Sequence, residues 1–261
     1  MINNKEQYIS HIKDKDEVMN MRRVLDKIEI VEDRHIVQAT DFLDPYEVRL
    51  AKSILNRFEH ISYIEDGGLS NAERKILIIY PNYMGFDLKE SPIAPLSISG
   101  NIEGLRHKDF LGSLLGLGIM RGKIGDILIH EDNVQIIVSS DISDYILFNL
   151  RKVGNNNINI EYINRDTLKE GIEKYKELIV NVSSLRLDAT ISSSFNLSRN
   201  DSLNIIKNGK VKVNWEPIKK PFFELKEGDI VSVRGYGRFV LYSIFGTTKK
   251  DRLKVGIRIF K

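Results

Sequence analysis

The stretch SRNDSLNIIKNGKVKVN, residues 198–214, predicts a short helix that turns sharply into a strand. Ser198 is typical of a helix N-cap, and Asp201 three residues later nearly completes a capping box. Gly209 stands where a left-handed residue ends a helix, just before the alternating residues VKVN. We therefore expect a helix-to-strand corner that carries several lysines and no catalytic side chain.

The sequence on either side of this corner predicts a small α/β domain. Upstream, SSLRLDATISSSFNL is expected to form another short helix, with Leu187, Ile191 and Phe195 on one face. Downstream, IVSVRG, FVLYSI and KVGIRIF are expected to form the strands of a small sheet. The predicted domain spans residues 183–261.

Charge is distributed unevenly along the chain. Residues 183–261 contain 16 Lys+Arg against 7 Asp+Glu, whereas residues 1–182 contain 23 against 29. A basic segment that offers donors without a general base is suited to the phosphates of folded RNA. We expect RNA contacts from nine residues of this segment: Arg186, Arg199, Asn200, Asn204, Lys207, Lys210, Lys212, Arg234 and Arg238.

Structural roles are the alternative for some of these residues. Lys207 and Lys210 also fit a role in offsetting the negative end of the helix dipole. Arg234 and Arg238 flank the glycines of RGYGRF, a turn that packing alone would also explain.

The pattern of motifs in residues 184–239 resembles an S4 RNA-binding domain. It consists of RLD in the first helix, SR opening the second, the corner I-x-x-G-x-V-x-V-N, and GD before a valine-rich strand. The resemblance implies an αL-type module that recognises structured RNA by shape, through its pair of helices and its basic corner.

The flanking sequence is similar to the YlmH family of Gram-positive bacteria. The similarity rests on RGYGRF and on HKDFLGSLLGLGIMRGKIGDI, which precedes the S4-like segment, and it covers nearly the whole chain. It implies a cytoplasmic protein, encoded near cell-division genes, that binds the large ribosomal subunit in the rescue of stalled translation. The S4 domain would then hold ribosomal RNA and peptidyl-tRNA.

The chain as a whole is expected to be α+β. Residues 1–75 are predicted to be mostly helical, with a helix starting at the cap Asp44. Residues 76–163 are predicted to form a ferredoxin-like middle domain, in the order β-α-β-β-α-β from Ile93 onward. A connecting segment, 164–182, contains the strand-like KELIVNV.

The strands of the middle domain offer few aromatic residues for base stacking, so we do not expect it to bind RNA as an RRM does. Contacts with ribosomal or division proteins are expected for residues 1–163. Arg121 and Lys123 are candidates for a second RNA contact, although solvated loop charge is the favoured interpretation.

Several classes of function lack support in the sequence. Cysteine is absent, no P-loop or zinc-ligand pattern occurs, and no apolar run reaches the length of a membrane span. We expect no cofactor, no metal, no membrane contact and no enzymatic activity. RLDAT at 186–190 invites comparison with pseudouridine synthases, so an RNA-modifying enzyme is one alternative, and a cell-division scaffold is another.

Overall fold

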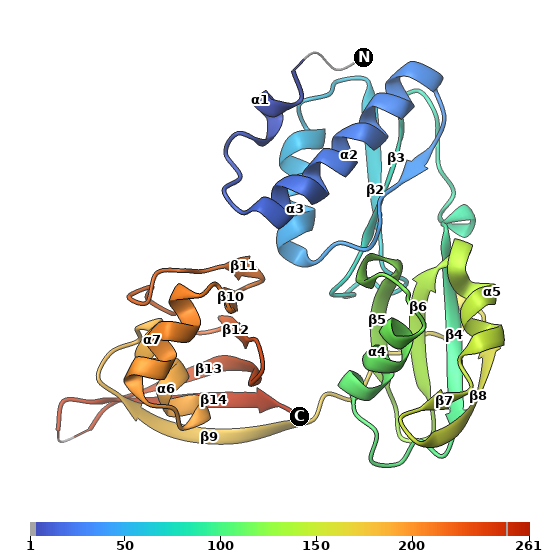
Figure 1. Ribbon diagram of the computed structural model, residues 1–261. Helices are drawn as coiled ribbons and strands as arrows, with labels where there is room; N and C mark the ends of the chain where they lie inside the picture. The colour runs from blue at the N-terminus through green and yellow to red at the C-terminus, as the bar shows by residue number, and fades with distance from the viewer. Residues whose placement is uncertain (1–3, 249) are drawn as a thin grey trace. The chain divides into compact units, whose positions relative to one another are not determined.

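The computed structural model describes residues 4–248 and 250–261, and the chain divides into two compact units between Ile172 and Glu173 (Figure 1). Each unit has its own hydrophobic core. In the described part of the chain, none of the helices has the length and apolar character needed to cross a membrane.

The first unit begins with helices packed on a small sheet of strand order β1-β3-β2. Its elements are α1 (Glu6–Ile9), α2 (Lys15–Arg34), β1 (Gln38–Ala39), α3 (Pro45–Leu55), β2 (Ile61–Asp66) and β3 (Ile76–Pro81).

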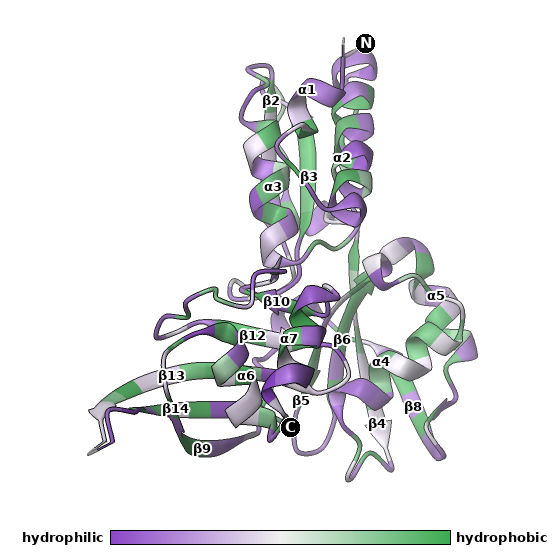
Figure 2. Cartoon of the chain, turned by 60° about the vertical axis from the view of Figure 1, so that its left-hand side comes forward, coloured by the Kyte–Doolittle hydropathy of each residue, from purple (hydrophilic) through white to green (hydrophobic). Residues whose placement is uncertain are grey.

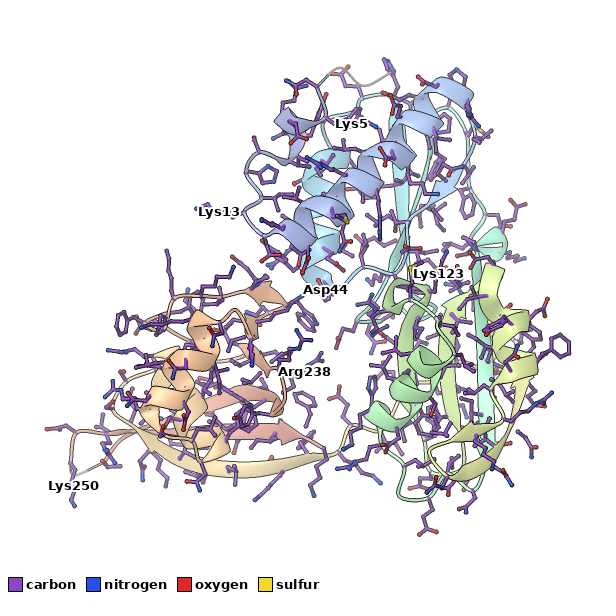
Figure 3. All side chains as sticks on the ribbon, in the orientation of Figure 1. Lys5, Lys13, Asp44, Lys123, Arg238 and Lys250 are labelled. Carbon is purple, nitrogen blue, oxygen red and sulfur yellow. The ribbon has the colours of Figure 1, made fainter. Side chains whose placement is uncertain are left out.

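Helix α3 confirms the predicted start at Asp44. The Asp44 carboxylate accepts from the N–H groups of Tyr46 and Glu47, and the Glu47 carboxylate accepts from the N–H of Asp44. This reciprocal capping box, followed by Pro45 at the first helical position, fixes where the helix begins (Asp44 is labelled in Figure 3).

Two features of this region differ from the prediction. Residues 61–66, expected to be helix or turn, form strand β2, and residues 76–81, assigned to the middle domain, pair with β2 and β1. Strand β3 begins with four hydrophobic residues (Figure 2), in keeping with the burial of both of its faces. Leu77 and Ile79 face the helices, whereas Ile76 and Ile78 belong to a different cluster. A boundary at residue 75 would therefore cut through this sheet.

The rest of the first unit has the predicted ferredoxin-like order. Its sheet runs β5-β6-β4-β8-β7, with antiparallel pairing throughout and helices α4 and α5 on one face. The strands and helices are β4 (Ile93–Gly100), α4 (His107–Gly116), β5 (Ile124–Ile129), β6 (Val134–Ser139), α5 (Ser140–Asn149), β7 (Lys152–Val153) and β8 (Asn156–Tyr162). Short 3-10 turns are η1 (Leu88–Glu90), η2 (Arg121–Lys123) and η3 (Arg165–Thr167).

The other face of this middle sheet is largely covered. Ile137 of β6 is fully buried in a cluster with Ile76, Ile78 and Leu168. The Gln135 side chain donates to the carbonyl of Thr167 at 3.0 Å and accepts from the N–H of Lys169 at 2.9 Å. The β6 part of the face that an RRM would present to RNA is thus occupied by the chain itself, whereas Asn159 and Glu161 of β8 are exposed.

The second unit is a six-stranded antiparallel sheet of order β11-β10-β12-β13-β14-β9, with two helices packed on one face. Its elements are β9 (Tyr175–Val182), α6 (Leu187–Phe195), α7 (Arg199–Lys207), β10 (Val211–Val213), β11 (Glu216–Pro217), β12 (Ile230–Val233), β13 (Gly237–Thr247) and β14 (Leu253–Phe260).

Strand β9 confirms the strand expected at KELIVNV but not its assignment to a connecting segment. It pairs with β14 along its whole length, from Tyr175 opposite Phe260 to Val182 opposite Leu253. Because the sheet is incomplete without β9, the second unit begins at Glu173 and not at residue 183.

Candidate nucleic-acid interface

Helix α7 of the second unit has the predicted caps at both ends. The Ser198 hydroxyl accepts from the N–H of Asp201 at 3.1 Å, which starts α7. At the other end Gly209 has φ +69°, the N–H of Gly209 donates to Ile206 and the N–H of Lys210 donates to Ile205. This hydrogen-bond pair is a Schellman motif, so a local sequence signal fixes the corner that presents the lysines.

A buried aspartate holds two of the candidate arginines. Asp188 is 0% exposed, and Arg186 donates to both of its carboxylate oxygens at 3.0 and 2.8 Å. The Nε of Arg199, at the start of α7, lies 3.6 Å from the same carboxylate. Arg186 also lies over the ring of Phe222, 4.1 Å from its centroid. The charge of Asp188 therefore orients both guanidinium groups at the surface of the helix pair.

The exposed face of α7 carries the polar residues predicted for it. Asn200, Asn204 and Lys207 are exposed, while Ile206 on the opposite face is fully buried. Lys210 is exposed immediately after the Schellman turn. Together with Arg186 and Arg199, these four side chains make up what we call the helix-pair surface.

The remaining three candidates lie elsewhere. Lys212 and Arg238 alternate with buried neighbours on β10 and β13, so their side chains lie on the sheet face away from the helices. Arg234 lies in the turn between β12 and β13, where its N–H donates to the carbonyl of Lys210 at 2.9 Å. The nine candidates thus occupy two faces of the unit and one turn.

Two aromatic residues beside these arginines were not singled out from the sequence. Phe222 is 67% exposed and stacks under Arg186. Trp215 lies beside Arg238, with 5.4 Å between the guanidinium carbon and the ring centroid. Because each of these contacts joins residues more than 20 positions apart, no local periodicity signals it.

Arg121 and Lys123, the candidates for a second RNA contact, bind other residues of the first unit. Arg121 donates to the carbonyls of Ile124 and Gly125, and burial lowers its pKa to about 10, which leaves it charged at neutral pH. Lys123 pairs with Asp141 at 2.8 Å and with Asp41 at 3.3 Å. These contacts join parts of the first unit and leave the two cations only partly exposed.

No catalytic or metal centre emerges in the described ranges 4–248 and 250–261. No group of histidine, aspartate and glutamate side chains there could hold a metal ion. Both oxygens of Asp188, the aspartate of RLD, are occupied by Arg186, and the residue is inaccessible. A catalytic aspartate has to reach its substrate, so the geometry gives Asp188 a structural role.

Three family models match the chain. They are "YlmH, N-terminal" over residues 16–84, "Putative RNA-binding domain in YlmH" over residues 93–167, and "S4 domain" over residues 185–231. The fold and these matches define the class, which is that of S4-domain RNA-binding proteins.

Relatives across the whole length make the assignment more specific. The chain is 34% identical over 243 residues to "Ribosome-associated protein quality control protein P2" of Bacillus subtilis, covering 92% of this chain and 94% of that protein. The chain belongs to the YlmH family. A solved structure, "Cell division protein ylmH from Streptococcus pneumoniae", shares the fold at 21% identity and a TM-score of 0.54, covering 60% of this chain and 97% of that one.

A partial match concerns an enzyme. An "Uncharacterized RNA pseudouridine synthase" of Aquifex aeolicus is 37% identical over 51 residues, which cover 20% of this chain and 21% of that protein. The full-length relative and the domain matches instead identify the chain as a non-enzymatic RNA-binding protein.

Proposed function

We propose that the second unit binds structured RNA of the large ribosomal subunit, peptidyl-tRNA or both, in the quality control of stalled ribosomes in the cytoplasm. The name of the Bacillus subtilis relative, which is similar along nearly the whole chain, supports the ribosomal setting. The observation that carries the proposal is the helix-pair surface, where a buried carboxylate orients two arginines beside exposed asparagines and lysines.

The chemistry of this surface suits a folded RNA backbone. Fixed guanidinium groups bind phosphates with defined geometry, whereas Lys207 and Lys210 supply charge that is less directional. Asn200 and Asn204 offer amide donors and acceptors to sugars or base edges. Such a surface recognises the contour of an RNA more than its sequence.

The role of the first unit is a further part of the proposal. The middle domain matches a model described as RNA-binding, which differs from our expectation of a protein contact for residues 1–163. Leu168 and strand β3 cover the β6 part of its sheet face, whereas Asn159 and Glu161 of β8 stay exposed, so we expect any RNA contact of this domain to use its helices, its loops or the β8 side. We propose that it orients the protein on the ribosome.

Charge reversal on the helix-pair surface tests the proposal. The double variant K207E/K210E should bind protein-free large-subunit rRNA more weakly, and the slope of log affinity against log salt should fall by roughly one to two phosphate contacts. Filter binding across a salt series measures both quantities.

The matched control is K13E/K15E, which makes the same change of net charge on exposed residues of the first unit. An equal loss of affinity in both double variants, or an unchanged slope in K207E/K210E, would contradict the placement of the surface. Pseudouridine formation by the wild-type protein on rRNA or tRNA would contradict the non-enzymatic role.

Sedimentation tests whether the protein binds the large ribosomal subunit through its second unit. We expect the wild-type protein to co-sediment with large subunits that carry peptidyl-tRNA, and K207E/K210E to remain in the supernatant. Equal recovery of the two proteins with the subunits would count against the S4 unit as the site of binding.

A further inference from the structure

Both loop residues of the hairpin between β10 and β11 have a left-handed backbone, which asparagine tolerates and tryptophan does not favour. Val213 pairs with Glu216, so Asn214 and Trp215 alone form the loop, and their φ values are +48° and +66°. Two successive left-handed residues are what a tight hairpin requires, and Asn-Gly is the usual solution. Asparagine tolerates this backbone, but tryptophan with its Cβ and large ring is disfavoured.

The first loop residue is well accommodated. The Asn214 side chain accepts from the N–H of Ile230 at 3.0 Å and donates to Asp229 at 2.8 Å. These bonds tie the hairpin to the start of β12 through Asn214 and do not involve Trp215. Trp215 is therefore kept in an unfavourable conformation that a glycine would adopt without strain, and such outliers gather at functional sites.

The surroundings of Trp215 indicate a ligand class. Lys212 pairs in register with Ser232, and Ser232 with Arg238, which places two cations in one row on the outer face of the sheet. The Arg238 guanidinium lies 5.4 Å from the centroid of the Trp215 ring (Arg238 is labelled in Figure 3). Glu216 pairs with the inward-facing Val213, so its carboxylate lies on the other face.

An aromatic ring beside cations is the usual platform for unstacked nucleotides. The ring stacks on a base of any identity, while the cations bind the adjoining phosphates. A protein partner would be expected to present acidic groups here, whereas RNA combines negative charge with flat rings. The net positive charge of the second unit favours RNA.

We propose that Trp215 is held at this hairpin corner to stack on an unpaired base of the bound RNA, with Lys212 and Arg238 contacting the neighbouring phosphates. The inference rests on the proposed RNA-binding function and extends it from the helix-pair surface to the outer face of the sheet. It assigns recognition of folded backbone to one face and capture of an unpaired nucleotide to the other.

Trp215 is the single tryptophan of the chain, so its fluorescence reports on this site directly. Titration of the full-length protein with protein-free large-subunit rRNA should quench the fluorescence, with the same midpoint as binding. A fully paired RNA duplex, which has no unstacked base, should leave the fluorescence nearly unchanged. Binding of rRNA without quenching would overturn the proposal.

Substitutions of Trp215 distinguish a role in RNA binding from a role in stability. Trp215→Gly should keep or raise the urea midpoint of unfolding, because glycine suits the left-handed backbone, yet lower rRNA affinity by about 5- to 150-fold, as expected for the loss of one stacked base. Trp215→Phe should retain more affinity than the glycine variant because a ring remains. A lower midpoint in W215G with unchanged rRNA affinity would assign Trp215 to packing and refute the proposal.

The same measurements distinguish this inference from the proposed function. If K207E/K210E loses rRNA binding while W215G retains it, the proposed function stands and the stacking inference fails. If the wild-type protein does not bind rRNA, both fail. If W215G binds rRNA normally but binds whole large subunits poorly, Trp215 contacts a protein and the stacking inference is wrong.

Discussion

At the scale of single residues, Asp188 links the stability of the second unit to its RNA-binding surface. The residue lies in α6 and is fully buried, but its partners Arg186 and Arg199 come from the starts of both helices. Burial of a carboxylate is favourable only if hydrogen bonds and opposite charge replace its water. Arg186 supplies the hydrogen bonds, and Arg199 adds a second cation 3.6 Å away. The RLD motif is thus a clamp between the helices.

Replacing the carboxylate tests this clamp. Asp188→Asn keeps the shape of the side chain but removes the charge that holds the arginines. We expect a loss of about 1.5–3 kcal/mol in the free energy of unfolding, the usual worth of hydrogen bonds to a charged group. The affinity for rRNA should also fall, because both guanidinium groups lose their fixed positions. Urea denaturation and filter binding measure the two effects.

The control for this substitution is Glu227→Gln, which removes an exposed carboxylate from the same unit. It should change stability by less than about 0.5 kcal/mol. If D188N were as stable as E227Q, the description of Asp188 as a clamp would be wrong.

At the scale of elements, one ion pair connects the small N-terminal sheet to the end of the middle domain. Asp66 closes β2 and is 4% exposed, Arg165 of η3 donates to both of its oxygens, and the Ser91 hydroxyl donates to it as well. The two partners are 99 positions apart.

Removing the arginine should destabilise the first unit. Arg165→Ala leaves the Asp66 carboxylate buried without its cation, and breaking a buried pair in this way costs about 3–5 kcal/mol. Arg22→Ala removes the exposed partner of Glu6 and should cost less than about 1 kcal/mol. Thermal or urea unfolding compares the variants, and equal stability of the two would contradict the importance of the Asp66 pair.

The same pair predicts a dependence of stability on pH. Burial by itself would raise the pKa of Asp66, but hydrogen bonds from Arg165, Ser91 and the Gly68 N–H outweigh burial and lower it. Because the folded-state pKa lies below the unfolded value of about 3.9, the stabilisation is complete above that pH and is lost as the pH falls through the folded pKa. Unfolding free energies of the wild-type protein should fall in this acid range.

The Arg165→Ala variant provides the comparison. Without its cation, Asp66 should no longer titrate below its usual pKa, so the acid loss attributable to this residue should disappear. An identical acid profile in wild type and variant would show that other carboxylates control the transition.

At the scale of the whole molecule, the chain consists of two units with separate cores, and the helix-pair surface belongs entirely to the second. The second unit depends on β9, which supplies the buried Val182 and the partly buried Val180 to its core. Strand β9 also covers the edge of β14. The two strands pair over the full length of both, from Val182 opposite Leu253 to Tyr175 opposite Phe260. An autonomous RNA-binding fragment should therefore start before β9.

Truncation tests this boundary. A fragment of residues 173–261 should unfold cooperatively and bind rRNA, whereas residues 183–261 should be much less stable. Each buried valine or leucine that is lost removes about 1.5–3 kcal/mol, and the whole domain has only about 5–15 kcal/mol to lose. Circular dichroism during urea titration compares the fragments, and equal midpoints would show that β9 is dispensable.

Much of the molecule could be predicted where the signal was local. Ser198, Gly209 and Asp44 mark helix ends through bonds to residues within five positions, and the structure confirms each of them. The ferredoxin-like order from Ile93 was also predictable, because alternating strands and short helices specify it. Strand β2 was missed because its residues ISYIED follow a strong helix without a clear break.

The amino-acid sequence by itself determined the kind of each well-marked element, the caps, the S4 corner and the basic character of the last third of the chain, because those depend on neighbours along the chain. Only the tertiary structure decided that β3 belongs to the first sheet, that β9 completes the last, that Asp188 holds two arginines and that Trp215 lies beside Arg238. Apart from the contact between Arg186 and its near neighbour Asp188, these are pairings between residues well separated along the chain. Their partners are selected by which buried surfaces and charges fit together in three dimensions, and no periodicity along the chain records that choice.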